Sequence, residues 1–208
     1  MKNLLHLFFV LFTMSFFQSQ ILKPNEVIWD KARKLSTEDF QIKTDDTLNP
    51  IRSTVIITWE LMGFSVFNKN FNQNVTNKII KSASVINPDL PNVDQLIDYQ
   101  QTVFDLAEIY ARKMRKDLYT NKSKLWKGFD FASDILNEQL NEFHRVQLLM
   151  DRQTNSGNDS EKLKKWKDLI KTELSKTEQY DYQNKTKINP EKNDSETHYL
   201  LYNATRFF

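Results

Sequence analysis

Two carboxylates three residues apart, Asp105 and Glu108, are the side chains best placed for acid–base chemistry in this sequence. On a helix this spacing puts both on one face, where one can donate a proton while the other accepts one. His144 lies on a later helical stretch and could complete a hydrolytic site with them. The competing interpretation makes His144 an ordinary surface or hydrogen-bonded helix residue. His198 falls in a polar stretch, where we expect it to be solvated.

Composition excludes most other chemistry. The 208 residues include no Cys and three Gly, which argues against thiol catalysis, disulfides, Cys-based metal sites and Gly-rich phosphate loops. With 29 basic against 27 acidic residues, the net charge of +2 is too small for an electrostatically driven nucleic-acid binder. A basic run at 162–167 contains one Trp, but its acidic neighbours favour a solvated helix face. We therefore expect a folded protein that has no nucleic-acid partner.

The first twenty residues have the pattern of a secretory signal peptide. Lys2 gives a short basic start, residues 4–12 form an apolar run, and Ser15 and Ser19 are small residues near the end. The apolar run is too short to span a bilayer comfortably. We expect residues 1–20 to be removed, leaving a periplasmic or secreted protein with no stable membrane span.

The candidate residues need a domain to position them, and the first part of that domain is rich in strand patterns. Residues 27–29 form a short apolar run, and residues 53–67 contain alternating apolar side chains typical of a half-buried strand. The phase of the alternation changes at Met62 and Gly63, which indicates a β-bulge. Residues 68–76 are polar and predict a hairpin loop, and residues 78–87 predict the return strand.

The second part has helical periodicity. Asn92 with Gln95 resembles a capping box, and a broad apolar stripe predicts a central helix from Val93 to about residue 118. A second helix begins near Ser123 or Asp130 and ends near Thr154. Gly157 can cap that helix, and Asn158 with Glu161 can start a third. The third helix has an apolar stripe of Leu163, Trp166, Ile170 and Leu174.

The domain is expected to span residues 21–178, as a single α+β unit. From Tyr180 to Thr197 the chain is polar, and Ile188 is its one aliphatic residue. This composition predicts a mobile segment, because little apolar surface is available to offset the cost of ordering the chain. Residues 179–208 are therefore expected to form a polar C-terminal tail whose end is apolar again.

One helical segment resembles a known family. Residues 99–112 have the sequence Y-Q-Q-T-V-F-D-L-A-E-I-Y-A-R. This is similar to the pattern H-E-Q-x-H-F-D-I-A-E-x-x-A-R of a bacterial domain family described as secreted zinc-dependent proteases. Residues 150–157, M-D-R-Q-T-N-S-G, are similar to that family's Y-D-x-E-T-x-H-G, and a weaker similarity includes Trp29, residues 33–35 and residues 39–40.

The resemblance implies a zincin-like α+β fold, with a small antiparallel β-sheet followed by about three α-helices. It also implies that the two carboxylates support the helix, with Arg112 pairing with Glu108 four residues before it. The positions that match the family's motif, and are implied to be supporting, are Gln101, Phe104, Asp105, Glu108, Arg112, Asp151, Thr154 and Gly157.

The departures from the family pattern fall on the metal chemistry. In the family, two His at i and i+4 would bind zinc, and the Glu beside the first would act as general base. Here Tyr99 and Val103 replace the two His, Gln100 replaces the Glu, and Ser156 replaces a later His. None of these residues supplies an imidazole ligand or a basic carboxylate, and Gln153 replaces a further Glu. The resemblance thus implies a degenerate member without zinc.

The sequence therefore favours an exported, non-catalytic relative of the zinc-protease family, with no cofactor and with an unidentified protein or peptide as partner. An active hydrolase that uses Asp105, Glu108 and His144 is the first alternative. A purely structural component of the cell envelope is the second.

Overall fold

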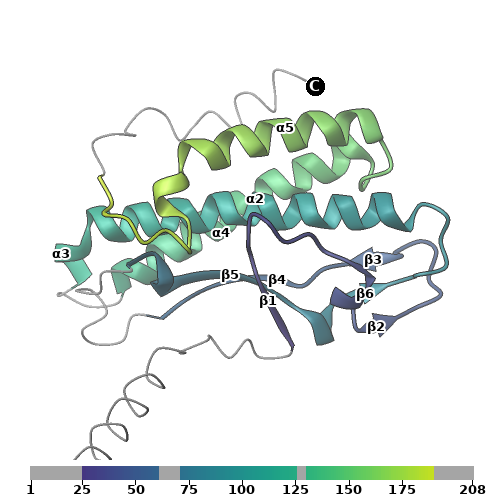
Figure 1. The fold of residues 1–208 in the computed structure, drawn as a ribbon, viewed down its shortest axis with the longest axis horizontal. Helices are drawn as coiled ribbons and strands as arrows, with labels where there is room; N and C mark the ends of the chain where they lie inside the picture. The colour runs from purple at the N-terminus through teal and green to yellow at the C-terminus, as the bar shows by residue number, and fades with distance from the viewer. Residues whose placement is uncertain (1–24, 61–70, 126–129, 190–208) are drawn as a thin grey trace, which may run out of the picture.

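The computed structural model describes residues 25–60, 71–125 and 130–189. Within them the helices are α2 (Val93–Thr120), α3 (Lys122–Leu125), α4 (Asp130–Thr154) and α5 (Ser160–Lys176). Helix α2 forms the middle of the molecule, with the strands on one side and α4 and α5 on the other (Figure 1). The predicted α+β class is confirmed, and so are the three long helices.

The strands form two small sheets. The first has the order β1-β5-β4 and is antiparallel throughout, with β1 (Glu26–Ile28), β5 (Val75–Ile80) and β4 (Val55–Trp59). The second has the order β2-β6-β3, with β2 (Ile42–Lys43), β6 (Val85–Ile86) and β3 (Ile51–Arg52). Strand β2 runs parallel to β6, whereas β3 runs antiparallel to it.

The return strand predicted at 78–87 is divided between these sheets. It starts earlier, at Val75, and a 3-10 turn at Lys81–Ala83 separates β5 from β6. Ser84 explains the break, because its hydroxyl donates to Ile80 O at 2.8 Å and accepts from Thr54 N at 2.9 Å. The predicted loop at 68–76 instead contains a 3-10 turn at Phe71–Asn74. The bulge predicted at residues 62–63 lies outside the described residues.

The helix starts differ from the predicted capping boxes. Asn92 is the N-cap of α2 but makes no side-chain capping bond. Gln95 does not close a box, because its Nε2 donates to Gly157 O at 2.7 Å and to Asn158 O at 3.0 Å. Helix α5 is capped by Asp159, whose carboxylate accepts from Lys162 N at 3.0 Å, one residue after the predicted Asn158. The Gln95 amide therefore makes a long-range contact with the loop between α4 and α5 in place of the predicted local capping bond.

Two apolar clusters meet at helix α2. One joins α2 to α4 and α5 and reaches the strands through Ile57 and Val75, and its members include Leu106, Val146 and Trp166, all fully buried. The other lies on the strand side and includes Trp29, Phe40 and Phe104. This burial on both sides explains the broad apolar arc of the central helix. In the described part of the chain, no helix is both long and apolar enough to cross a bilayer.

The segment after α5 differs from the expected polar tail. A 3-10 turn at Glu178–Tyr180 follows the helix, and Tyr180, Tyr182 and Ile188 are all buried. Two of these are aromatic residues, which bury large apolar areas even in a polar sequence. Residues 178–189 therefore pack as part of the domain.

Candidate functional site

A polar stripe runs along α2 where a helix this buried would normally present apolar residues. The spacing between successive members is alternately four and three residues, which keeps them on one side of the helix. The members are Asp94, Asp98, Gln101, Asp105, Glu108, Arg112 and Arg115. We call this set the polar seam. The matched family positions Gln101, Asp105, Glu108 and Arg112 all belong to it.

The middle of the polar seam holds the N-terminal arm, residues 29–37. Gln101 Oε1 accepts from Leu35 N at 2.9 Å, and Gln101 Nε2 donates to Asp105 Oδ1 at 2.8 Å. The same Asp105 oxygen accepts from Trp29 Nε1 at 2.8 Å. Burial raises the pKa of Asp105, and these two hydrogen bonds act in the opposite direction. The two residues thus attach the arm to α2, a supporting role like the one that the resemblance implies.

The end of the polar seam holds the segment after α5. Glu108 Oε1 accepts from Arg112 Nε at 3.1 Å and from Arg115 Nη1 at 2.6 Å, and all three side chains are buried. Arg112 also pairs with Asp181, and its Nη1 donates to Leu174 O at 2.8 Å.

Arg115 extends this buried network to the sheet and to the chain after α5. It donates to Val75 O on β5 and, at 2.9 Å, to Tyr180 O. Glu108 is therefore one acceptor in a buried network of charged groups that joins α2, β5 and the C-terminal segment.

Tyr99, which stands where the resembling family has its first His, is packed into the core. Tyr99 is 5% exposed, and its hydroxyl donates to Asp151 Oδ1 at 2.9 Å. Gly157 lies directly against the ring, since a Cβ placed there would come 2.4 Å from Tyr99 Cβ. Desolvation by burial raises the pKa of Tyr99 further above its usual range. This phenol is therefore a neutral structural group.

The other replaced positions are structural or exposed. Val103 is 2% exposed within the apolar cluster on the α4 side. Gln100 Oε1 accepts from Ser53 N at 2.9 Å and from Ser53 Oγ at 2.5 Å, so its amide attaches α2 to the strand layer. Ser156 is exposed and has a positive φ of 54°.

The loop between α4 and α5 lies beside Tyr99. Thr154 Oγ1 accepts from Gly157 N at 3.1 Å, which closes this loop. Gln153 Oε1 accepts from Trp166 Nε1 at 2.9 Å, so it joins α4 to α5. The positions around residues 99, 103 and 156 thus form packed core and a loop.

The residues of the alternative hydrolase are not assembled into a site. His144 is exposed on α4, and its ring lies 5.3 Å from that of the neighbouring Phe143. Asp105 binds the arm, and Glu108 binds two arginines. No group of three His, Cys, Asp or Glu residues within 25–60, 71–125 and 130–189 could hold a metal ion.

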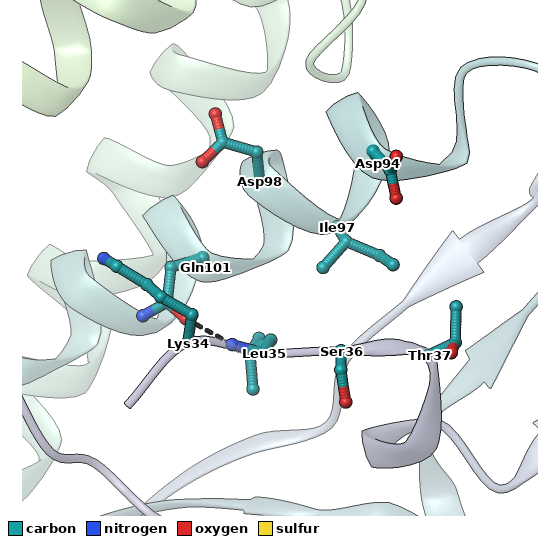
Figure 2. Close-up of a pocket in the computed structure, with 8 residues that line it drawn as sticks. All are labelled: Lys34, Leu35, Ser36, Thr37, Asp94, Ile97, Asp98 and Gln101. Atoms are coloured by element: carbon teal, nitrogen blue, oxygen red, sulfur yellow. Dashed lines mark hydrogen bonds between the residues drawn. The ribbon is translucent and has the colours of Figure 1, made fainter. Parts of the chain in front are cut away.

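Two cavities open along the polar seam, one on each side of Lys34. The first, of about 450 Å³, lies between residues 34–37 and the start of α2. Figure 2 shows Ile97 extending from α2 toward this segment, and the hydrogen bond from Leu35 to Gln101 beside Lys34. Asp94 and Asp98 add carboxylates to its helix side.

The second cavity, of about 500 Å³, lies between the arm, α2 and α5, and we call it the α5 cavity. Trp29, Ile170 and Leu174 contribute its apolar lining, and Asp105 and Arg112 of the polar seam also line it. Its remaining cations are lysines of the arm and of α5: Lys31, Lys34, Lys167 and Lys171. It combines apolar surface with a few convergent charged groups, as small-ligand sites do.

Sequence reasoning did not find this cavity. The signal that was present is the alternation of polar residues by four and three on a helix predicted to be buried. The lysines gave no separate signal, because they are spread over two segments more than 130 residues apart. Comparison with known protein families, with curated proteins and with solved structures finds no match for this chain.

Proposed function

We propose that this protein is an exported, non-catalytic relative of the secreted zinc-protease family that acts as a binding protein outside the cytoplasm. The observation that carries the proposal is the packing of Tyr99, which fills the first ligand position and contacts both Asp151 and Gly157. The same contact supports the relationship, because it brings together the two segments on which the resemblance depends. The partner is a protein, a peptide or a smaller ligand, and nucleic acid is not expected.

The binding face that this proposal favours is the side of α2 with the polar seam. Both cavities open along the seam, one beside the arm at the start of α2 and one between the arm, α2 and α5. The arm between them is attached through Gln101 and Asp105. Residues that resemble the motif of an enzyme would then serve to hold a binding surface.

Zinc content and peptide hydrolysis test the proposal directly. We expect protein purified from an export host to contain no stoichiometric zinc by elemental analysis, and to release no fragments from casein. The variant His144→Gln is the matched control, because it removes the exposed imidazole of the alternative hydrolase without disturbing a buried contact. One zinc per chain, or casein cleavage that this variant abolishes, would contradict a non-catalytic role.

A further inference from the structure

We infer that the α5 cavity binds a monoanionic ligand in which a carboxylate is attached to an apolar body. This inference rests on the proposed function, because it names the ligand class of a non-catalytic binding protein.

Positive charge is concentrated around this cavity. Helix α5 carries six Lys against three acidic residues, a net charge of +3, and residues 29–34 of the arm add +2. The whole chain has a net charge of only +2, so the rest of it is acidic on balance. The local field therefore favours an anion at the cavity mouth.

Two of the lysines are available to a ligand. Lys31 pairs with Glu178 at 3.1 Å and Lys167 pairs with Asp98 at 2.6 Å. Lys34 and Lys171, by contrast, have no ion pair within 4.0 Å in the described part of the chain, although burial raises the pKa of Asp105 and the charge of Lys34 acts on that carboxyl in the opposite direction. An ammonium without a fixed partner is a flexible point charge, which suits a carboxylate held at the mouth of a cavity.

Arginine does not supply the anion contact. Arg112 uses its guanidinium on Glu108, on Asp181 and on Leu174 O, and its side chain is 2% exposed. Asp105 and Asp168 also line the cavity, and they would repel a head group with two negative charges. A monoanion fits this balance better than a phosphate monoester does.

The lining accommodates an apolar body behind the charge. The indole of Trp29 and the side chains of Ile170 and Leu174 line the cavity, and the methylene stems of the lysines add apolar surface. A volume of about 500 Å³ is within the usual range for small-ligand sites. A medium-length alkyl chain or two apolar side chains would fit such a space.

Calorimetric titration of the full exported chain with octanoate tests the inference, with octan-1-ol and octylammonium as probes of matched length. We expect saturable binding of octanoate at one site, and at least about tenfold weaker binding of the two other probes, the difference that about 1.4 kcal/mol gives. N-acetyl-Leu-Leu with a free carboxylate, compared with its amide, distinguishes a peptide C-terminus from a free acid as the source of this chemistry. Tighter binding of octanoate would identify a free acid as the ligand, and tighter binding of N-acetyl-Leu-Leu would identify a peptide C-terminus.

Two variants and one control locate the binding. Lys34→Gln with Lys171→Gln should weaken carboxylate binding about tenfold, because each lysine gives a charge-assisted contact. Lys164→Gln with Lys187→Gln removes the same charge from exposed positions that do not line the cavity, and should change affinity less than about twofold. Ser175→Trp, at an exposed lining position, should block the cavity and abolish binding.

The inference is overturned if neither carboxylate binds, if the uncharged probes bind equally well, or if the lysine variant and its control behave alike. Such a result leaves the proposed function intact as long as the protein is free of zinc and inactive on casein. Stoichiometric zinc with casein cleavage would instead contradict the proposed function, whatever octanoate does.

Discussion

Tyr99 and Gly157 lie in direct contact, and they belong to the two segments that resemble the protease family. Gly157 has a φ of 86°, and any Cβ there would overlap the tyrosine side chain. The glycine is therefore required both by its backbone conformation and by the space available. Tyr99 is held from its other end by Asp151. A small residue and a large one therefore pack directly against each other at this point of the fold.

Gly157→Ala tests this packing. We expect the free energy of unfolding to fall by about 2 to 4 kcal/mol, because the methyl group meets Tyr99 Cβ at 2.4 Å and the backbone is strained. Urea denaturation measures the change.

The neighbouring Ser156→Gly is the control for the glycine substitution. It relieves a positive φ at an exposed residue and should stabilise the protein slightly, by about 0.5 kcal/mol. Equal stability of Gly157→Ala and the wild type would mean that the loop does not lie against Tyr99.

At the scale of elements, the interface between α2 and α4 contains a carboxyl group in an unfavourable environment. Burial, assisted by the nearby Glu138, raises the pKa of Asp117 to about 6. Lys116 and Lys113 act in the opposite direction, as does the hydrogen bond from Gln139 Nε2 at 3.2 Å. The folded protein therefore holds a proton on Asp117 more tightly than the unfolded chain does.

The sign of the pH dependence follows from this shift. Between about pH 4 and pH 6 the folded state binds more protons at Asp117, so its contribution to stability decreases as the pH rises. Asp117→Asn should remove this dependence and raise the free energy of unfolding at pH 7 by about 1 to 2 kcal/mol. Urea unfolding of the variant and the wild type at pH 4.5 and at pH 7 measures this difference in the free energy of unfolding. A variant that is stabilised equally at both pH values, or destabilised at pH 7, would contradict the assignment.

The C-terminal segment is attached to α2 by the ion pair between the carboxylate of Asp181 and Arg112. Without this carboxylate, Glu108 would be the carboxylate shared by the buried guanidinium groups of Arg112 and Arg115. Asp181→Asn should lower the free energy of unfolding by about 1 to 3 kcal/mol, because it leaves two buried guanidinium groups sharing the single carboxylate of Glu108. It should also increase proteolysis within residues 178–189, measured by mass spectrometry of the first fragments.

Asp134→Asn is the matched control for this change, since Asp134 is exposed on α4. We expect it to leave both the stability and the cleavage pattern near those of the wild type. If the two variants are cut alike, the ion pair between Arg112 and Asp181 does not hold the segment.

For the whole molecule, the N-terminal sequence predicts export, and export would set the compartment in which a ligand is met. The basic start and apolar run of residues 1–20 predict cleavage near residues 19–21. The intact mass of protein recovered from its native host should therefore correspond to a chain that begins there. A mass that includes residues 1–20 would contradict the expected periplasmic or secreted location.

Periodicity in the sequence was sufficient for the three long helices and for strand β4. These elements follow local rules, namely the 3.6-residue and two-residue repeats of apolar side chains. The residue types at positions 99, 100, 103 and 156 likewise predict that no zinc site is present there, because none of them supplies an imidazole or a basic carboxylate.

Only the tertiary structure decided what the polar residues of these elements do. Gln95 was expected to cap its own helix, but it binds a loop more than 60 residues away, and Asp181 was expected in a polar tail, but it pairs with Arg112. A buried polar group must find a partner wherever the packing of elements offers one, and that partner can be far away in the chain. The α5 cavity arises in the same way, since its lysines converge only when the N-terminal arm packs beside α5.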